Sequence, residues 1–311
     1  MTTTTKGGKV LIVVVNYNGH DYTDECLASL LQIDRPEARV ALVDNGSTDG
    51  SGERLRQKYG DRIVYLPLPV NLGVTGGNNA GIDHALRHGF DYVMFLNNDT
   101  VVVPDFLGRM IEASRREGGA LVVPKIICFF DQTRLDHFIG TEFNWLTGQP
   151  LDYRPYPLDR PELNRRTKIR VASTCCLLVP AGLFGRIGRM DEKYFMYYDD
   201  SDFTIQAARA GCEIVYEPAA VIYHKCNMTT RNQQPSFFEY YLQNRNVFYF
   251  YGKLCPDRIK KWRLLSKKVV QMLKDYLKSY IKRQPRQRQV IRLIVRDLLR
   301  KRMGPPPALK K

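Results

Sequence analysis

The chain has 311 residues, of which 44% are apolar and 25% charged, the ordinary balance of a globular protein. No apolar run approaches the ~20 residues needed to cross a bilayer, and the first residues lack the apolar segment of a signal peptide. The seven cysteines are scattered and form no C-x-x-C pair, which argues against a zinc site or a disulfide framework. We therefore expect a cytoplasmic protein that is soluble or peripheral to a membrane.

The positive charge is concentrated at the C-terminal end. The whole chain has a formal charge of +15. Residues 256–311 hold 19 Lys and Arg against 3 Asp and Glu, so this segment carries +16 and the first 255 residues are close to neutral. The basicity is therefore a property of the tail.

Apolar strands and amphipathic helices alternate through the first 125 residues. This alternation is typical of βαβ units and predicts an α/β fold, with a mainly parallel central sheet and flanking helices. The expected strands cover residues 9–15, 39–43, 63–66, 92–96 and 120–123. The expected helices cover residues 21–31, 53–59, a stretch that opens in the glycine-rich residues 71–81 and runs to about 88, and a stretch after 104 that runs to about 117.

The second half of the chain is less regular. Residues 129–170 are predicted to be a long surface loop, and such loops are usually functional or disordered. Trp145 lies in this loop, where it is equally compatible with an anchor for the loop and with a platform for a substrate. Further along we expect strands at 171–179, 213–216 and 219–223 and helices at 203–210, 237–250, 257–283 and 287–302. The predicted organisation is a flexible N-terminus at 1–8, one large domain at 9–254, and a basic amphipathic helical tail at 255–311.

Polar side chains follow several expected strands at the point where each strand ends. In open α/β sheets, ligands bind just beyond the C-terminal ends of the strands, so these side chains should converge on one crevice. In residues 93–100, apolar residues run directly into Asn97, Asn98 and Asp99. Taken alone, this stretch is better explained as a turn that closes a core strand. The whole set comprises Asn16, Asn18, Asp44, Asn45, Gly76, Gly77, Asn78, Asn98 and Asp99.

This set of residues suits a nucleotide. Asp44 can accept a hydrogen bond from a ribose hydroxyl or a base N–H, and Gly76 and Gly77 allow the backbone to approach a ligand closely. Neither a G-x-x-x-x-G-K-[ST] phosphate loop nor a G-x-G-x-x-G turn after the first strand is present. A divalent cation on Asp99 would neutralise phosphates instead, and His224 could add an imidazole ligand that suits Mn²⁺. The alternative for His224 is a buried structural histidine.

The aromatic residues at 194–198 are followed by three acids, Asp199, Asp200 and Asp202. Crowding of the carboxylates and burial by Tyr197 and Tyr198 should raise the pKa of one of them. A carboxylate tuned in this way can take a proton from a hydroxyl during a reaction. The alternative is an acidic helix N-terminus that the helix dipole stabilises.

Taken together, these residues resemble family 2 glycosyltransferases of the GT-A fold, and most closely the bacterial rhamnosyltransferase-like and galactofuranosyltransferase-like members. The similarity covers roughly residues 10–252 and rests on the order and spacing of its motifs. The motifs are Val14-Val15-Asn16-Tyr17-Asn18, Val43-Asp44-Asn45-Gly46-Ser47-Thr48-Asp49, Asn71-Leu72-Gly73, Gly76-Gly77-Asn78-Asn79, Leu96-Asn97-Asn98-Asp99, Tyr198-Asp199-Asp200-Ser201-Asp202, His224, Tyr240-Tyr241 and Arg245-Asn246.

The resemblance implies inverting transfer of a sugar from a UDP- or dTDP-linked donor to a hydroxyl of a glycan or lipid-linked acceptor. Asp44 would hold the nucleoside, and Asp200 would be the catalytic base. Asp99 would take the metal-binding place of the family's Asp-x-Asp, with His224 as a second ligand for Mn²⁺ or Mg²⁺. The implied donor-binding residues are the strand-end set given above, and the implied acceptor-binding residues are Trp145, Tyr198, Asp199 and Asp202.

The chain departs from the family pattern at several points. Asn97 stands where the first Asp of Asp-x-Asp usually is, which weakens that side's hold on a cation. Asp199 replaces the usual Glu and is shorter by one methylene. The Gln-x-x-Arg-Trp signature of processive synthases is missing, because Gln243 and Arg245 are followed by no Trp. The resemblance therefore implies addition of one or a few sugars rather than a polymer.

The basic tail has three interpretations. Its first helix is expected to place Trp262, Leu265, Val269, Leu273 and Tyr276 on one side and cations on the others, which is typical of a helix lying on an anionic membrane. The protein would then be peripheral on the inner face of the cytoplasmic membrane. Packing of the apolar side onto the rest of the chain, or onto a second subunit in a homodimer, is the next alternative. Nucleic acid is the least favoured partner, although basic helices also suit phosphate backbones.

Two rival functions remain open from the sequence. A nucleotidyltransferase would share the α/β nucleotide crevice, but the chain lacks a glycine-rich, Lys- or Arg-bearing phosphate loop after the first strand. A nucleic-acid-binding protein is suggested by the overall charge alone and is disfavoured because the first 255 residues are neutral.

Overall fold

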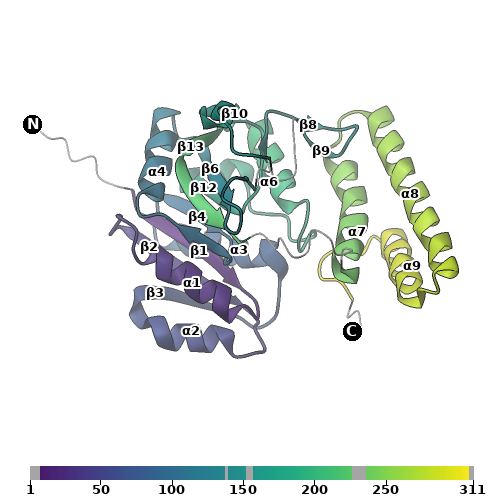
Figure 1. The fold of residues 1–311 in the computed structure, drawn as a ribbon, viewed down its shortest axis with the longest axis horizontal. Coiled ribbons are helices and arrows are strands. Elements are labelled where there is room, and N and C mark those ends of the chain that lie inside the picture. The colour runs from purple at the N-terminus through teal and green to yellow at the C-terminus, as the bar shows by residue number, and fades with distance from the viewer. Residues whose placement is uncertain (1–7, 137–138, 152–156, 226–235, 308–311) are drawn as a thin grey trace, which may run out of the picture.

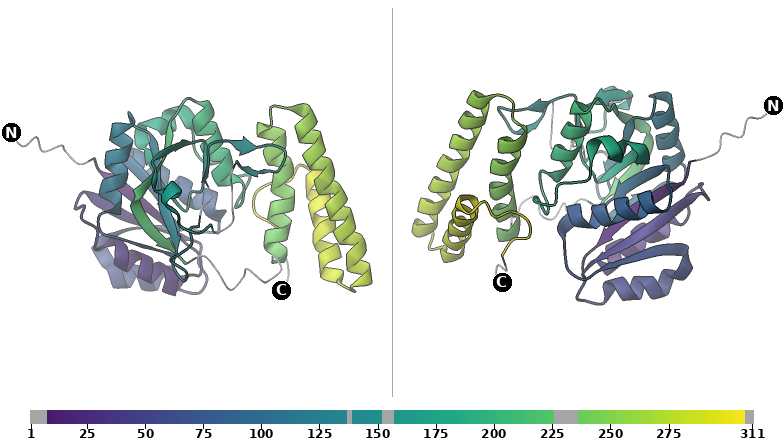
Figure 2. Two further views of the ribbon diagram at one scale, coloured as in Figure 1. Left: turned by 45° about the horizontal axis from the view of Figure 1, so that its top comes forward. Right: turned by 180° about the vertical axis from the view of Figure 1, so that it is seen from behind.

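The computed structural model describes residues 8–136, 139–151, 157–225 and 236–307 (Figure 1). Residues 1–7, most of the N-terminus expected to be flexible, lie outside these ranges. An α/β part is built on one central sheet, and helices α7, α8 and α9 lie together beside it (Figures 1 and 2). The predicted α/β fold class is confirmed.

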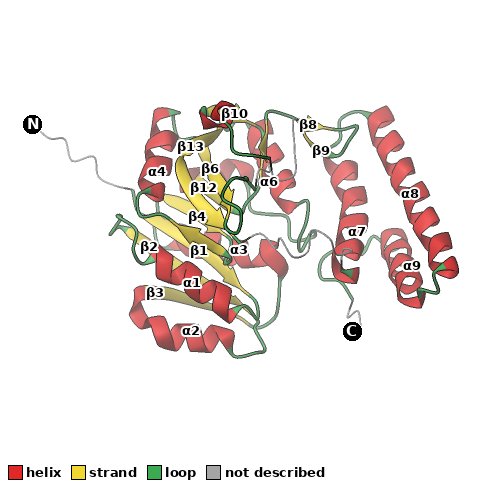
Figure 3. Ribbon diagram, in the orientation of Figure 1, coloured by secondary structure: helices red, strands yellow, loops and turns green. Residues whose placement is uncertain are grey.

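The centre of the α/β part is a nine-stranded mixed sheet (Figure 3). Its strand order is β10-β13-β6-β12-β4-β1-β2-β3, and β5 pairs with β13. Strands β1 to β4 run parallel, as the βαβ alternation predicts, whereas β12 runs antiparallel to both of its neighbours. The strands of this sheet are β1 Val10–Asn16, β2 Ala38–Asn45, β3 Ile63–Leu68, β4 Tyr92–Leu96, β5 Thr100–Val102, β6 Leu121–Cys128, β10 Thr167–Ile169, β12 Cys176–Pro180 and β13 Ile214–His224. Two short antiparallel pairs lie outside this sheet, β7 Ile139–Gly140 with β11 Val171–Ala172 and β8 Phe143–Asn144 with β9 Gln149–Pro150.

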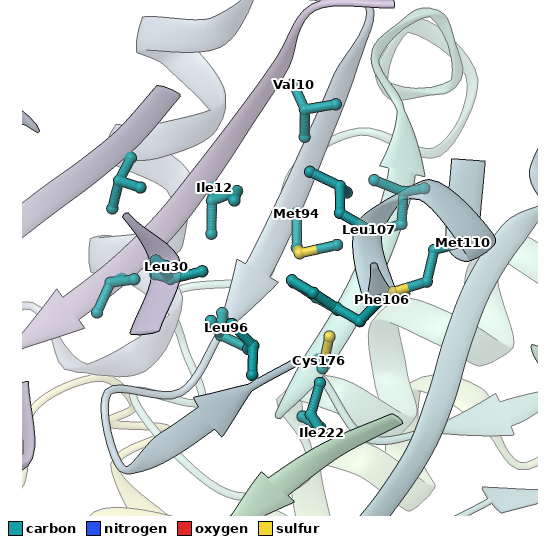
Figure 4. Close-up of a cluster of buried hydrophobic side chains, with 14 of the residues drawn as sticks. Val10, Ile12, Leu30, Met94, Leu96, Phe106, Leu107, Met110, Cys176 and Ile222 are labelled. Atoms are coloured by element: carbon teal, nitrogen blue, oxygen red, sulfur yellow. The ribbon is translucent and has the colours of Figure 1, made fainter. Parts of the chain in front are cut away.

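Helices bury both faces of the sheet. Successive strand residues point to opposite faces, so Val10 and Ile12 of β1 belong to one core cluster and Leu11 and Val13 to another. The first cluster also takes side chains from α1, α2 and α4, and Figure 4 shows Phe106 of α4 facing the sheet in this cluster. The second cluster takes side chains from α3, α5 and α6. These helices are α1 His20–Leu30, α2 Ser51–Tyr59, α3 Gly73–Arg87, α4 Phe106–Arg116, α5 Phe184–Ile187 and α6 Asp199–Arg209.

The structure differs from the sequence prediction in four places. The strand expected at 171–179 is divided into β11 and β12, and the two strands expected at 213–223 are one strand, β13, with an irregularity between Glu217 and Val221. Helix α6 begins at Asp199, earlier than expected, because acids are stabilised in the first turn of a helix. The short strand β5 was not expected. It pairs with the end of β13 and aligns Thr100 with His224.

The glycines at 76 and 77 do not form a turn. They lie in the first turns of α3, where Gly77 and the nearby Gly81 face Val15 and Val13 of β1. A Cβ on Gly81 would lie 2.5 Å from both methyl groups of Val13. Gly77 and Gly81 allow α3 to pack closely on the sheet, and a contact of Gly76 or Gly77 with the donor stays a prediction.

Helix α7 connects the α/β part to the two basic helices. Phe250 of α7 packs with Leu264 of α8, and Leu242 of α7 packs with Met272 of α8 and Ile294 of α9. The tail thus packs on the rest of the chain, which is one of the alternatives left open above. The helices are α7 Phe237–Leu254, α8 Arg258–Ile281 and α9 Pro285–Leu299.

The apolar side predicted for the first basic helix nevertheless lies largely at the surface. Trp262, Val269 and Leu273 are 72%, 53% and 56% exposed, whereas Leu264 and Met272 make the buried contact. Helix α8 therefore has a second apolar side that α7 and α9 leave largely exposed, although its Val269 and Leu273 line a cavity together with Ile291 of α9. Among the described residues, no helix is both long enough and apolar enough to span a membrane.

Replacing Gly81 by Ala should lower the free energy of unfolding by ~1–3 kcal/mol, the usual cost of overpacking a core. The added methyl group would collide with the stiff side chain of Val13, which outweighs the better helix propensity of alanine. Urea unfolding measures this change. Gly185→Ala is the matched control, because the space around this helical glycine is open, and it should show no loss. Unchanged stability of the Gly81 variant would contradict the packing role.

Candidate active site

Two adjoining cavities lie where β1, β2 and β4 end. The first, which we call the strand-end cavity, has a volume of about 740 Å³ and is lined by Asn45, Asn98 and Asp99 among others. The second, the aspartate cavity, has a volume of about 490 Å³ and contains Asp199 and Asp200. The residues that line both cavities are Val74, Asn97, Thr174 and Met196. The convergence of strand ends on one crevice is therefore observed.

Asp99 and His224 meet at the wall of the strand-end cavity. His224 Nε2 lies 3.0 Å from Asp99 Oδ1, and its Nδ1 lies 2.6 Å from Asp136 Oδ2. The pairing of β5 with the end of β13 brings these residues together across 125 positions of sequence. Burial opposes a charged imidazole, yet Cys175, Asp136 and Asp99 together hold the pKa of His224 well above its usual value.

The residues at this wall fit a divalent cation that takes the place of the proton on His224 Nε2, because a metal binds the neutral imidazole. Asp136 fixes Nδ1 of His224, which leaves Nε2 directed at Asp99, and histidines that bind metals are commonly oriented in this way. No cluster of three or more His, Cys, Asp or Glu side chains suited to a metal occurs in the described part of the chain. A cation here would therefore have two protein ligands and would need further oxygens from a bound ligand or from water.

Asp199 and Asp200 open helix α6 at the aspartate cavity. Burial raises the pKa of both carboxyls above the usual value for Asp. The neighbouring Asp200 raises the pKa of Asp199 further. Asp200 reaches a pKa of about 6, because hydrogen bonds from Ser201, Ser173 and the Thr174 backbone offset part of the effect of burial. The pKa of Asp200 therefore lies nearer to neutral pH than that of an ordinary aspartate, which suits this carboxyl to exchange a proton.

A strained turn separates the two cavities. Phe195, Tyr197 and Tyr198 have left-handed backbones, with φ of 67°, 68° and 68°. The side-chain amide of Asn246 donates to the carbonyls of Tyr194, Met196 and Tyr197 at 2.9, 2.8 and 3.2 Å, and these contacts hold the turn. We call residues 194–198 the aromatic turn. It positions Tyr198, which lines the aspartate cavity beside Asp199 and Asp200.

Two residues predicted to bind an acceptor lie elsewhere. Asp202 is buried and accepts a hydrogen bond from Lys253 at 2.7 Å, away from the lining of the aspartate cavity. Trp145 stacks on Phe250 with ring centroids 5.8 Å apart. The structure thus shows Trp145 as an anchor for its loop, and an acceptor-binding role for either residue stays a prediction.

The first strand-end residues mainly fasten the loops around the strand-end cavity. Asn16 is fully buried and donates to Ser47 and Ser51, and Asn18 receives a hydrogen bond from the Thr48 backbone at 2.8 Å. These contacts tie the loop after β1 to the loop after β2. A direct donor contact by Asn16 or Asn18 stays a prediction.

Asp44 and Asn45 continue this arrangement. Asp44 accepts a hydrogen bond from the Tyr65 hydroxyl at 3.0 Å. Asn45 donates to the Gly73 carbonyl at 2.9 Å and accepts from the Leu72 backbone, so it fixes the start of α3. Asn45 and Asn78 line the strand-end cavity, and Asn98 does so while donating to Thr23.

Sequence reasoning missed several residues of this site. Asp136 lies in the irregular middle, and nothing in its neighbourhood marks it as a partner of His224. Ser173 and Thr174 precede the cysteines of β12 without a motif of their own. Pro305, with the two prolines after it, lines the strand-end cavity from the far end of the chain. A single sequence offers no signal for contacts at such separations.

Comparison with known proteins identifies the family. Residues 11–188, more than half of the chain, match the family model described as glycosyl transferase family 2. The chain belongs to this family and is a glycosyltransferase. The predicted family and enzyme class are confirmed, and a nucleotidyltransferase or a nucleic-acid-binding protein is not supported.

Two named relatives are similar over most of their length. The chain is 31% identical over 241 residues to an N-acetylglucosaminyl-diphospho-decaprenol L-rhamnosyltransferase of Mycobacterium tuberculosis, a match that covers 71% of this chain and 78% of the relative. It is 24% identical over 245 residues to the low-salt glycan biosynthesis hexosyltransferase Agl10 of Haloferax volcanii, covering 76% of this chain and 73% of the relative.

Solved structures share the fold at lower sequence identity. S. aureus TarS residues 1–349 superpose with a TM-score of 0.52 at 17% identity, covering 84% of this chain and 70% of TarS. GalNAc-T7, crystallised with UDP, GalNAc and Mn²⁺, superposes with a TM-score of 0.57 at 12% identity, covering 84% of this chain and 54% of GalNAc-T7. These likenesses confirm the predicted GT-A fold.

Proposed function

We propose that this glycosyltransferase transfers a sugar from a UDP- or dTDP-linked donor, with inversion, to a hydroxyl of a glycan or lipid-linked acceptor in surface polysaccharide synthesis. The observation that carries the proposal is the position of Asp200 in a cavity that adjoins the one lined by Asp99, the partner of His224. A base and a diphosphate site placed side by side are what a direct displacement requires. The name of the mycobacterial relative makes rhamnosyl transfer to a lipid-linked diphosphate sugar the first reaction to test.

The strand-end cavity is proposed to hold the donor. Asp44 and Asn45 at the end of β2 would bind the nucleoside side, and the diphosphate would lie towards Asp99. Asp99 and His224 would hold Mn²⁺ or Mg²⁺, which is supported by their convergence and by Asp136 on the far side of the imidazole. Such a cation neutralises the charge that develops on the departing diphosphate.

The aspartate cavity is proposed to hold the acceptor. Asp200 takes the proton of the acceptor hydroxyl as its oxygen attacks the anomeric carbon. The bond from that carbon to the diphosphate oxygen breaks on the opposite side, so the configuration inverts. Burial and the neighbouring Asp200 raise the pKa of Asp199, which favours a protonated carboxyl that can donate a hydrogen bond to the acceptor. Asp199 would in this way serve in place of the longer glutamate that the family usually has at this position.

Asp200→Asn should lower kcat by ~10²–10⁴, the usual contribution of a general base. The amide is nearly isosteric, so donor and Mn²⁺ binding, measured by calorimetry, should persist. Asp105→Asn, at an exposed acid outside both cavities, is the matched control and should keep full activity. Near-full turnover in the Asp200 variant would refute the assignment of the base.

The pH profile of kcat/KM should show the ionisation of Asp200. The base acts as a carboxylate, so activity is present above its pKa and is lost as the pH falls through about 6. Below that point kcat/KM should fall ~10-fold per pH unit, as for a single essential base. The profile is measured with buffers of constant ionic strength. A profile that stays level down to pH 4.5 would contradict a base with a raised pKa.

The exposed apolar side of α8 is proposed to rest on an anionic membrane surface. Ile259, Trp262 and Leu273 are 79%, 72% and 56% exposed on a segment that carries a large positive charge. An exposed apolar side beside cations suits the boundary between lipid headgroups and acyl chains. A lipid-linked acceptor would lie in the same membrane.

The protein should float with vesicles that contain phosphatidylglycerol and not with pure phosphatidylcholine. The double variant Trp262→Glu and Leu273→Glu should lose flotation, because both added charges would enter the apolar boundary. Leu86→Glu, on exposed apolar surface of α3, is the control and should float as the wild type does. Undiminished flotation of the double variant would refute the proposal. The proposal would also be refuted if the wild type bound no vesicles but formed a homodimer that the double variant could not form.

A further inference from the structure

The C-terminal end of the described chain returns to the strand-end cavity. After α9 it runs back beside α7, as the yellow segment in Figures 1 and 2 shows. Lys301 and Gly304 have left-handed backbones, with φ of 52° and 82°, which allow the chain to change direction there. Pro305, Pro306 and Pro307 then line the strand-end cavity. We call residues 304–307 the C-terminal wall.

Two backbone hydrogen bonds fix the C-terminal wall at Gly304. Its N–H donates to the carbonyl of Lys193 at 2.8 Å, and its carbonyl accepts from Nη1 of Arg245 at 2.8 Å. Gly304 itself is buried. The position of the prolines is therefore set by contacts with the residue before the aromatic turn and with α7.

Arg245 is a fully buried cation that lies over the ring of Tyr241, 5.2 Å from its centroid, and donates further hydrogen bonds to backbone and amide oxygens. Its Nη2 donates to the carbonyl of Tyr194 at 3.4 Å and to Asn246 Oδ1 at 2.9 Å. Burial of an ion is costly unless its hydrogen bonds are well satisfied. A guanidinium is suited to this place because its planar donors can serve several acceptors at once.

One pair of adjacent residues on α7 thus fixes two parts of the cavity lining. Asn246 holds the aromatic turn, whose Phe195 and Met196 line the strand-end cavity. Arg245 holds the C-terminal wall and contributes to the aromatic turn through Tyr194. Segments that are far apart in the sequence therefore line the strand-end cavity together.

We propose that the C-terminal wall contacts the bound nucleoside diphosphate sugar, and that Arg245 is the positioning residue that holds the wall in place. The inference rests on the proposed function, which assigns this cavity to the donor. Three consecutive prolines have fixed φ angles and no N–H groups, so they present a rigid apolar surface without unpaired donors. Such a surface can pack on a base, ribose or sugar ring and loses little conformational freedom when the donor binds.

The test replaces the prolines at 305, 306 and 307 together by glycine in the full chain. Calorimetry with UDP or dTDP, each with Mn²⁺, should show a Kd raised ~10-fold through loss of a preorganised surface. The kcat at saturating donor should change less than ~3-fold, because the wall does not line the aspartate cavity. Pro161→Gly, in an exposed surface turn, is the control and should leave Kd unchanged.

The outcomes separate this inference from the proposed function. A wild-type protein that binds neither nucleotide would overturn the proposed function. If the wild type and the triple-glycine variant bind nucleotide equally well, the proposed contact of the C-terminal wall with the donor is overturned and the proposed function is not. An increase in the Kd for nucleotide with kcat preserved supports the contact, since general loss of structure would lower both affinity and turnover.

Arg245→Lys tests the positioning role. Lysine keeps the charge but cannot serve Gly304, Tyr194 and Asn246 with the same geometry. The donor KM should rise as in the triple-glycine variant, and combining both changes should give less than the product of the two separate effects, because both act on one wall. Fully multiplicative effects on KM, or an unchanged KM in Arg245→Lys, would show that Arg245 does not act through the wall.

Discussion

The aromatic turn at 194–198 is the constraint on which the rest of the site depends. Each non-glycine residue in a left-handed conformation costs about 1–3 kcal/mol, and three of them occur within four positions here. Asn246 offsets this cost by donating to three carbonyls of the turn. The Phe195 carbonyl also accepts from the backbone of Val74 at 2.9 Å, which joins the turn to the start of α3. The turn can therefore separate the two cavities while contributing walls to both.

Gly73 shows how closely these elements approach. Its φ is +74°, and a Cβ there would lie 2.1 Å from the Phe195 carbonyl. Only glycine allows the start of α3 and the aromatic turn to meet at this point. The glycines further into α3 serve a different contact, with β1. The glycine-rich stretch is thus required by packing on two sides.

Burial and helix geometry give three nearby acids three different environments. Asp199 is buried and its pKa is raised furthest, Asp200 faces the aspartate cavity, and Asp202 points to Lys253. Asp199 and Asp200 both line the aspartate cavity, whereas Asp202, about 200° round the helix from Asp200, does not. Asp200, with its raised pKa, thus lies at the place proposed for the acceptor hydroxyl. Helix α7 fixes that place from the opposite side and also carries α8 and α9.

The sequence alone determined the α/β class, and the resemblance of its motifs identified the family and implied that Asp99 and His224 act together. The α/β class and the convergence of polar strand ends follow from hydrophobic periodicity and from the spacing of successive βαβ units. Tertiary structure decided what depends on contacts between distant segments, such as Asp136 on His224 and the prolines in the strand-end cavity. It also decided that Asp202 faces Lys253 and that α8 presents one apolar side to α7 and another to the surface. No periodicity predicts such choices, because they depend on which neighbours a folded backbone brings within a few ångströms.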